Sequence, residues 1–385
     1  MTSFIARGVL YSFLALTSLF FFSTCSEDPS SVGSFLLPMD IRVASIVLSA
    51  DSTATYRAPI SGASSTLLLG IFQATQTTVE SRLLLQFQIP AGFPDTLVVS
   101  ASLKLKPRYW FQDSSGTLAF TVHKIRIPWD EFKITFADTN VYDPTVRGSD
   151  SRPMSPRETL LVPIDTALVR EWLRTPGLSY GIFLKPAISS SVVYGFTSIL
   201  DLFTDDRPEL IVRYTVPDTT LRLDSLVLRT IQGAFVANAP QPPPSSDMMF
   251  IQAGVADRGL MHFSVDSIPR SASITSASLE FRRISALSVR NELSIDSILV
   301  QILLGPDSLG GTSGRAEPRP TENESVFTAD IRNIVQQWVT GTPNFGVALR
   351  AFGEFSTLDR FAVHGRTSPD TANRPILRIT YTVVR

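Results

Sequence analysis

The chain has 385 residues, of which 44% are hydrophobic, with 34 basic and 35 acidic residues and a formal net charge of −1. This hydrophobic content excludes a disordered chain, and the length suffices for two or three domains of ordinary size. The balanced charge lacks the excess of basic residues that binds polyanions, so we expect no nucleic-acid partner.

Residues 1–24 have the features of an export signal. Arg7 supplies the basic start, and residues 9–22 are uncharged and largely apolar but too few for a typical membrane-spanning helix. Small residues then precede Cys25, the only cysteine of the chain, in a pattern that resembles the lipidation site of a bacterial lipoprotein. We therefore expect removal of residues 1–24 as a signal peptide and lipidation of Cys25. An ordinary secretory signal and a membrane anchor are the alternatives.

Residues 25–37 begin with a polar stretch rich in Ser, which predicts a tether rather than a folded element. The acidic pair Glu27 and Asp28 resembles the surface-export signal of some lipoproteins. Several acyl chains on Cys25 would hold the protein stably to a membrane, because one chain alone binds only marginally. The expected location is the cell envelope, as an outer-membrane lipoprotein, and the acidic pair favours exposure at the cell surface.

From residue 41 onward, apolar and polar residues alternate in short segments, which predicts antiparallel β-strands with one face in water. The alternation is clearest where Ala101, Leu103 and Leu105 share one face while Ser and Lys residues occupy the other. The strands expected in this half of the chain are residues 41–48, 66–72, 82–89, 99–105, 118–127, 180–185 and 210–216.

The pattern changes its period at residues 164–172. Leu168, Val169 and Trp172 follow helical spacing, and Asp165 is suited to cap the first turn. We expect a short helix there, with Trp172 as its apolar anchor.

Two long stretches combine polar residues with turn-forming residues. Residues 138–158 are rich in Asp, Pro, Ser and Arg, and residues 305–325 are rich in Gly, Pro, Ser and Glu. We expect both to be loops. The length of the first suggests flexibility or a binding edge, and the second is expected to be mobile.

The same order of elements occurs twice. SASLKL at residues 100–105 returns as SASLEF at residues 276–281, and a strand that begins with Arg returns at the same offset of 176 residues. Two matches at one offset predict an internal duplication. We therefore expect two domains, residues 38–216 and residues 217–385.

The helix returns as well, at residues 329–338. Asp330 takes the place of Asp165, and Trp338 takes the place of Trp172. The shared residues are of the kind that build cores, whereas the copies differ in their loops. We therefore expect the repeated motifs to report the scaffold, and the differences between the copies to carry function.

The repeated motifs follow a fixed order: Arg-x-x-Leu/Met-x-Phe, SAxL, Trp on a short helix, Tyr/Phe-Gly-Ile/Val-x-Leu, and Arg-Pro-x-Leu-x-Val/Ile-x-Tyr. This order resembles the DNRLRE domain, a β-sandwich module of secreted and surface proteins that is related to disaggregatase-associated and carbohydrate-binding modules. The fold expected is all-β, with two tandem antiparallel jelly-roll β-sandwich domains, each with one short helix. The chain departs from the family at residues 196–199 and 361–364, where a Ser-Arg-Glu triplet is expected.

Tyr109, Trp110 and Phe111 are the candidate ligand-binding residues. Three consecutive aromatic residues on a strand cannot all face the core, because side chains alternate between the two faces. We therefore expect at least one to be exposed, where a sugar ring can stack on it. The alternatives are a packed strand end and an aromatic plug under a loop.

Acidic residues gather at two places. Asp201, Asp205 and Asp206 are a candidate calcium site, with a solvated turn as the alternative. Asp130 and Glu131 are adjacent, so their side chains point apart and cannot flank one bond as paired catalytic carboxylates must. We expect this second pair to lie in a solvated turn.

No motif for catalysis, for a transition metal or for a cofactor is evident. The three histidines, His123, His262 and His364, do not have the spacing of metal ligands. A Ser/His/Asp triad stays open at this stage, because its members meet only in the fold. We expect no catalytic residues, no metal site and no cofactor.

The resulting expectation is a non-catalytic, lipid-anchored protein of the cell envelope that binds a glycan or another surface component. The membrane is its first expected partner, through Cys25, and a glycan or a cell-surface protein is the second. The alternative is a structural or assembly subunit of a cell-surface complex. A third reading, a polysaccharide-degrading enzyme, requires acidic residues that converge in one groove.

Overall fold

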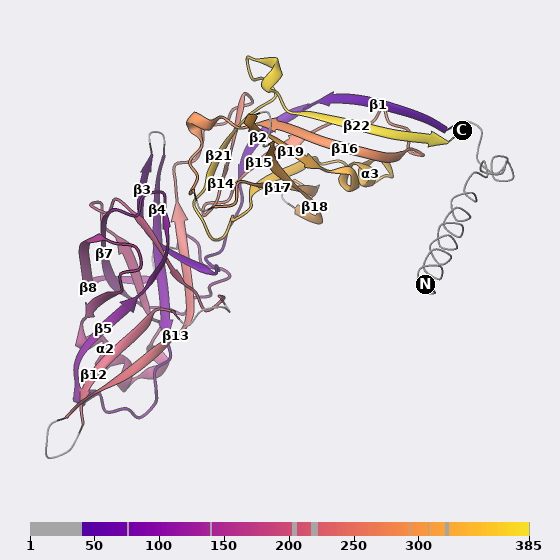
Figure 1. Ribbon diagram of the computed structural model, residues 1–385. Helices are drawn as coiled ribbons and strands as arrows, with labels where there is room; N and C mark the ends of the chain where they lie inside the picture. The colour runs from indigo at the N-terminus through magenta and orange to yellow at the C-terminus, as the bar shows by residue number, and fades with distance from the viewer. Residues whose placement is uncertain are drawn as a thin grey trace, which may run out of the picture.

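The structure is a computed structural model that describes residues 41–74, 77–138, 141–201, 206–216, 222–292, 294–306, 308–319 and 323–384. The predicted signal, the tether and Cys25 lie outside the described residues. Antiparallel strands make up 54% of the protein and the described helices are short, which confirms an all-β fold. None of the described helices is long and apolar enough to cross a membrane. The strands form two lobes that meet end to end at a narrow junction (Figure 1).

Lobe one holds the strands that follow one another from residue 66 to residue 238. They pair into two layers. One layer contains β9, β5 and β12. The other contains β4, β3, β11 and β6, and β10, β7 and β8 extend it from β4. The strands are β3 (Thr66–Ala74), β4 (Thr77–Phe87), β5 (Val98–Leu105), β6 (Pro107–Phe111), β7 (Gly116–Ile125), β8 (Tyr142–Met154), β9 (Leu160–Ile164), β10 (Ile182–Pro186), β11 (Val193–Thr197), β12 (Glu209–Thr215) and β13 (Leu223–Asn238).

Lobe two combines the C-terminal part of the chain with the first two described strands. Its strands are β1 (Ile41–Ser49), β2 (Ser52–Arg57), β14 (Met248–Gln252), β15 (Asp257–His262), β16 (Ser273–Arg282), β17 (Ile298–Gly305), β18 (Ser308–Arg319), β19 (Asn323–Asp330), β20 (Val347–Ala351), β21 (Arg360–His364) and β22 (Ile376–Val384). The helices of the two lobes are α2 (Thr166–Arg174) and α3 (Arg332–Val339), and single 3-10 turns lie at η1 (Asp95–Leu97), η2 (Pro176–Leu178), η3 (Ser285–Leu287) and η4 (Thr371–Asn373).

The opening strand of each repeat completes the other lobe. In lobe two, β1 pairs with β22 and β2 pairs with β15, although both opening strands precede lobe one in sequence. In lobe one, the long strand β13 pairs first with β12 and then with β4, although it opens the second repeat. The boundary expected between residues 216 and 217 therefore separates each opening strand from the lobe that it completes.

The two exchanged strands use equivalent registers. Leu48 lies opposite Leu377 in lobe two, and Leu228 lies opposite Leu210 at the matching position of lobe one. Further along, Thr53 lies opposite Met261, and Gly233 opposite Leu85 is its counterpart. The lobes are thus built alike, with the opening strands interchanged.

Chain order explains this pairing. β12 and β13 are consecutive strands joined by a short link, so they pair as a hairpin, which is the local arrangement for antiparallel neighbours. β22 is the last strand that the structure describes, and none of the other described strands forms such a hairpin with it. The N-terminal strand β1 occupies that place in lobe two.

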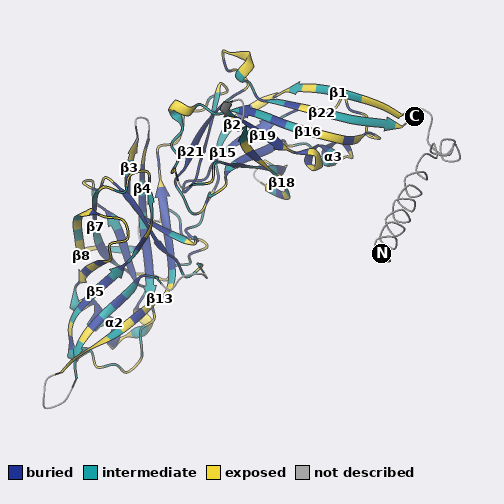
Figure 2. Cartoon of the chain, viewed as in Figure 1, coloured by how far each residue is buried: buried dark blue, intermediate teal, exposed yellow. Residues whose placement is uncertain are grey.

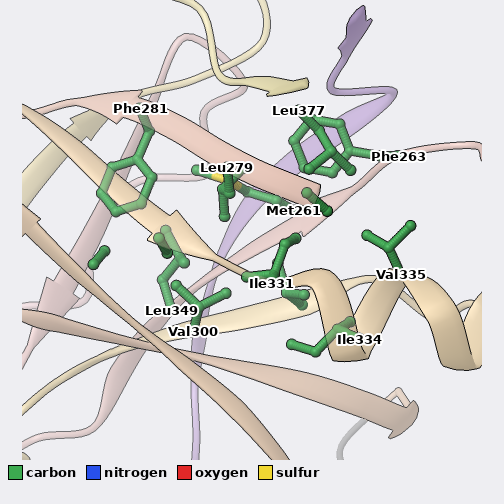
Figure 3. Packing of buried hydrophobic residues seen from close by; sticks show 14 of the residues in the cluster. Met261, Phe263, Leu279, Phe281, Val300, Ile331, Ile334, Val335, Leu349 and Leu377 are labelled. Carbon is green, nitrogen blue, oxygen red and sulfur yellow. The ribbon is translucent and has the colours of Figure 1, made fainter. Parts of the chain in front are cut away.

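Each lobe has its own hydrophobic core. In lobe two, residues from β15, β16, β17, β20, β22 and α3 interlock around Phe281, Leu279 and Met261 (Figure 3), and Ile46 and Leu48 of β1 pack against this cluster. The core strands are buried along most of their length, whereas β1 is largely exposed (Figure 2). β1 is therefore an edge strand that closes the core with one face only.

The two short helices confirm the helical predictions. Asp165 accepts the N–H of Ala167 at 2.9 Å and caps α2, and Trp172 is 1% exposed. Asp330 accepts the N–H of Arg332 at the start of α3, and Trp338 is 5% exposed. Each tryptophan anchors its helix to the core of its lobe.

The repeated Tyr/Phe-Gly motif has a backbone cause. Gly181 and Gly346 both adopt positive φ angles, of 93° and 89°. A Cβ atom on Gly181 would lie 2.0 Å from the carbonyl oxygen of Leu85, and one on Gly346 would lie 2.3 Å from that of Met261. Only glycine fits here, because the next strand passes too close for any side chain.

Two predictions of irregular loops were wrong. Residues 142–154 form β8, which pairs with β7, and residues 308–319 form β18, which pairs with β17 and β19. β8 is bonded on one side and exposes many of its residues, so it needs no apolar stripe of the kind that reveals a strand in sequence.

Candidate functional site

The aromatic residues Tyr109, Trp110 and Phe111 lie on β6, at the junction between the lobes. Trp110 packs against the core of lobe one, whereas Tyr109 and Phe111 point the other way into an apolar cluster shared by both lobes. Phe111 is 1% exposed and meets Phe72 edge to face at 4.9 Å. Phe111 is thus buried, whereas Tyr109 and Trp110 are half-buried, and ligand binding by this trio stays a prediction.

Hydrogen bonds close the same junction. The side-chain amide of Asn291 in lobe two donates to the carbonyl of Trp110 at 2.5 Å, and that of Gln112 donates to the carbonyl of Arg290. The backbone N–H of Asn291 in turn donates to the carboxylate of Asp359 at 2.7 Å. The trio therefore lies beside a polar network that joins the lobes.

Asp359 is a buried titratable group of this junction. Burial raises the pKa of Asp359, against hydrogen bonds from Asn291 and Thr357 and the charge of Arg290, which lower it. An acid whose folded-state pKa is raised favours its neutral form, so its contribution to stability falls as pH rises through that pKa.

We expect Asp359→Asn to be more stable relative to the wild type at about pH 8 than at about pH 4, because the variant cannot acquire the buried charge. Urea unfolding of both proteins at the two pH values measures this difference, and the other carboxylates cancel in the comparison. A difference that is constant with pH, or that shrinks as pH rises, contradicts the assignment.

A groove of about 580 Å³ lies on lobe one, and Tyr109, Trp110 and Phe111 are not among its lining residues. It is lined by residues of β3, β4, β7, β8 and β10 and by the turn that follows β10. Its lining residues are Ile71, Glu80, Thr121, His123, Tyr142, Pro144, Lys185, Pro186, Ala187 and Ile188. The sheet face, not a loop, thus supplies most of this candidate binding site.

Tyr142 is the aromatic residue of the groove. Its ring stacks on that of Phe183, with ring centroids 4.5 Å apart and planes 8° apart, and lies 5.1 Å from the ring of His123. The side chain of Tyr142 is half-buried, so the packing below holds the ring while part of it stays in contact with solvent. An aromatic ring held in this way can receive a sugar ring without further ordering.

His123 forms part of the groove floor and is 6% exposed. Burial lowers the pKa of His123, so the neutral imidazole is favoured. Its Nδ1 lies 3.1 Å from the carbonyl of Asp143, which can only accept, so Nδ1 carries the proton. Nε2 then accepts from the hydroxyl of Thr121 at 2.8 Å, and this bond fixes the orientation of the Thr121 side chain.

Two charged side chains line the groove. Glu80 is neutralised by Arg82, whose Nε lies 2.6 Å from the carboxylate and whose guanidinium lies over the ring of Phe136 at 4.0 Å. Lys185 has no ion pair among the described residues. The groove therefore offers a hydrogen-bond donor with a positive charge beside an aromatic ring.

Sequence reasoning did not identify this groove. His123 carries a sequence signal, because it lies on a strand on the face opposite the main apolar stripe. Tyr142 lies in the stretch 138–158, whose length suggested flexibility or a binding edge but no particular residue. The groove exists only where β7, β8, β10 and the β3–β4 hairpin meet, which sequence alone does not determine.

The other candidate acidic residues make contacts within the protein, and the carbonyl of Asp201 accepts a hydrogen bond from Arg207 at 3.2 Å. Asp206 pairs with Lys106 at 2.9 Å and with Arg108, and Asp205 lies outside the described residues. Glu131 is buried and accepts the N–H of Gly233 at 3.2 Å, and burial raises the pKa of Glu131, so the expected solvated turn was wrong at this residue. Among the residues that the structure describes, no group of His, Cys, Asp and Glu is arranged to hold a metal ion.

No protein-family model matches the chain, and no curated protein matches it. One solved structure, of infectious bursal disease virus Gx strain, aligns at 11% sequence identity over 91% of this chain and 79% of that chain, with a TM-score of 0.13. A likeness at this level carries no argument about fold or function.

Proposed function

We propose that this chain is a non-catalytic, lipid-anchored protein of the cell envelope that binds a glycan through the groove of lobe one. The observation that carries the proposal is the half-buried Tyr142 ring on a hollowed sheet face, beside the polar groups of Thr121 and Lys185. Sugar rings stack on aromatic faces, and their hydroxyls require donors and acceptors nearby. A volume of about 580 Å³ lies within the range of small-ligand sites.

The lining of the groove also favours binding over cleavage. Glu80 is the single carboxylate among its described lining residues, and Arg82 neutralises it. Glycoside hydrolysis uses a pair of carboxyl groups that flank the scissile bond. A polysaccharide-degrading enzyme is therefore the weaker proposal.

The proposed anchor fits the position of the first described strand. Ile41 lies opposite Val384 at the tip of lobe two that is farthest from lobe one (Figure 1). A tether from a lipidated Cys25 would reach the folded part at this tip. Lobe one, with its groove, would then point away from an outer membrane, which suits a surface-exposed lipoprotein.

We propose further that each lobe is a jelly-roll β-sandwich of the DNRLRE type. In support, the repeated motifs occupy equivalent places, with the SASL strands β5 and β16 each next to a closing strand, β12 or β22. The two tryptophan-bearing helices pack at the same end of equivalent strands. A common ancestry of the lobes explains these equivalences without a common ligand.

We expect Tyr142→Ala to weaken binding of a glycan about tenfold, or by ~1.4 kcal/mol, because it removes the stacking surface. A glycan array probed with the wild-type protein identifies a ligand, and titration calorimetry compares the variant. Tyr214→Ala is the matched control, because Tyr214 is also half-buried in lobe one but packs against Phe93 outside the groove.

The triple variant Tyr109→Ala, Trp110→Ala and Phe111→Ala forms a further arm of this test. Loss of binding in the folded triple variant, with full binding by Tyr142→Ala, would move the site to the junction trio. Failure of the wild-type protein to bind any glycan on the array would overturn the proposal.

The second candidate function is a structural or assembly subunit of a cell-surface complex. The interchanged opening strands favour it, because they tie the two lobes into one elongated body (Figure 1). Pull-down from an envelope extract tests this role, and a protein partner recovered in stoichiometric amount supports it. Recovery of the same partner in the same amount with Tyr142→Ala would show that this role does not depend on glycan binding in the groove.

A further inference from the structure

The segment of residues 41–57, which contains β1 and β2, completes lobe two through contacts with parts of the chain that are distant in sequence. β1 pairs with β22 along its whole length, and β2 pairs with β15. At its end, Arg57 makes two hydrogen bonds to the carboxylate of Asp257, at 2.7 and 2.9 Å, and a third to the carbonyl of Ala239. The pairing of this segment lies wholly within lobe two.

The covalent link from this segment leads to the other lobe. Residues 58–65 contain neither helix nor strand and run from β2 in lobe two to β3 in lobe one. Ala58 donates its N–H to Ala256 of lobe two, whereas Gly62 already bonds to Ile134 and Phe235 of lobe one. The link thus crosses the junction within a few residues, as the hinge of an exchanged element does.

Lobe two accepts this segment in place of a hairpin strand. In lobe one the same position is filled by β13, which is joined to β12 by a short connection. In lobe two nothing but the segment of residues 41–57 pairs with β22 at its outer edge among the described strands. The contacts that hold it are the same whichever chain supplies the segment.

We propose that lobe two accepts residues 41–57 of a second copy of this chain, in the register that it uses for its own segment. The form in which the segment comes from a second copy and the form in which it comes from the same chain differ only in the path of residues 58–65. Protein concentration therefore decides between the two forms. This proposal rests on strand pairing alone, and it stands whether or not the groove of lobe one binds a glycan.

The acceptor is specific for this segment rather than for any extended strand. The side chain of Asp257 is fully buried, and Arg57 compensates its charge. A strand without a cation at that position would leave a buried carboxylate unpaired, which is strongly unfavourable. The apolar residues Ile46 and Leu48 must also face the core, which excludes a shift of the register by one residue.

The test uses two full-length chains that carry Cys25→Ser and different affinity tags. One carries Ser45→Cys and the other carries Thr380→Cys, since the hydroxyl oxygens of Ser45 and Thr380 lie 3.0 Å apart across the β1–β22 pair. Neither chain can form this disulfide alone. After co-expression and mild oxidation, we expect a reducible product of twice the chain mass that carries both tags.

Two controls keep the outcome decisive. The single chain with both substitutions establishes that the bond forms at this position. Ser45→Cys paired with Arg213→Cys, the equivalent position of lobe one, reports chance collisions. Absence of the doubly tagged product while the single chain forms its bond overturns the proposal, as does an equal yield from the Arg213 pair.

Discussion

Deletion of residues 41–57 is expected to unfold lobe two and to leave lobe one folded. The deletion removes the partner of β22 and of one edge of β15, uncovers the apolar contacts of Ile46 and Leu48, and leaves the buried Asp257 carboxylate without Arg57. Loss of one member of a buried ion pair alone costs about 3–5 kcal/mol, which is a large part of the stability of a domain.

Hydrogen exchange read by mass spectrometry measures this outcome lobe by lobe. Peptides from β14 to β22 should lose their protection, whereas peptides from β3 to β12 should keep theirs. If residues 41–57 instead paired with strands of their own repeat, the deletion would lower the hydrogen-exchange protection of lobe one. Loss of protection in lobe one with lobe two intact therefore contradicts the exchange of strands.

Trp172→Ala is expected to lower the free energy of unfolding of lobe one by about 3–5 kcal/mol, and Trp338→Ala is expected to do the same in lobe two. Both side chains are almost fully buried, at 1% and 5% exposure, and each fixes a short helix to the core of its lobe. Removal of either leaves a cavity that the surrounding strands can fill only in part.

Chemical unfolding followed in each lobe separately checks this pair of variants. The matched positions serve as controls for each other, because each variant should lower the unfolding midpoint of its own lobe first. A midpoint unchanged from the wild type in either variant would contradict the assignment of that tryptophan to the core.

Local patterns predicted local structure well. The alternation of Ala101, Leu103 and Leu105 with polar residues gave the position and the inner face of β5, and all three are buried. Asp165 and the helical spacing that ends at Trp172 predicted α2 and its cap. These features depend on neighbours in sequence, so they can be read from sequence.

The partner of each opening strand could not be predicted from the repeat. Because β1 and β13 are equivalent, the same residues face each other whether an opening strand pairs within its own repeat or with the other one. The observed pairs place leucine opposite leucine, as Leu48 with Leu377 and Leu228 with Leu210. The alternative pairs, Leu48 with Leu210 and Leu228 with Leu377, would do the same. Chain connection, not side-chain chemistry, decides between the two.

The candidate site was predicted least well, for two physical reasons. Burial of Phe111 and partial burial of Tyr109 depend on contact with a second lobe, and no alternation pattern within β6 reports that contact. Tyr142 lies on an edge strand, whose exposed and polar sequence is typical of a loop. Two sequence features lie at the groove: the position of His123 opposite an apolar stripe, and the length of the stretch 138–158, which suggested a binding edge.

The exchange of opening strands is the central claim, and one pair of disulfides tests it most directly. In a chain with Cys25→Ser, the pair Ser45→Cys and Thr380→Cys should form an internal disulfide, because these residues face each other across β1 and β22. The pair Ser45→Cys and Arg213→Cys should form none, because Arg213 faces Ser225 instead. A disulfide to position 213 and none to position 380 would place the opening strand in its own repeat and contradict the structure.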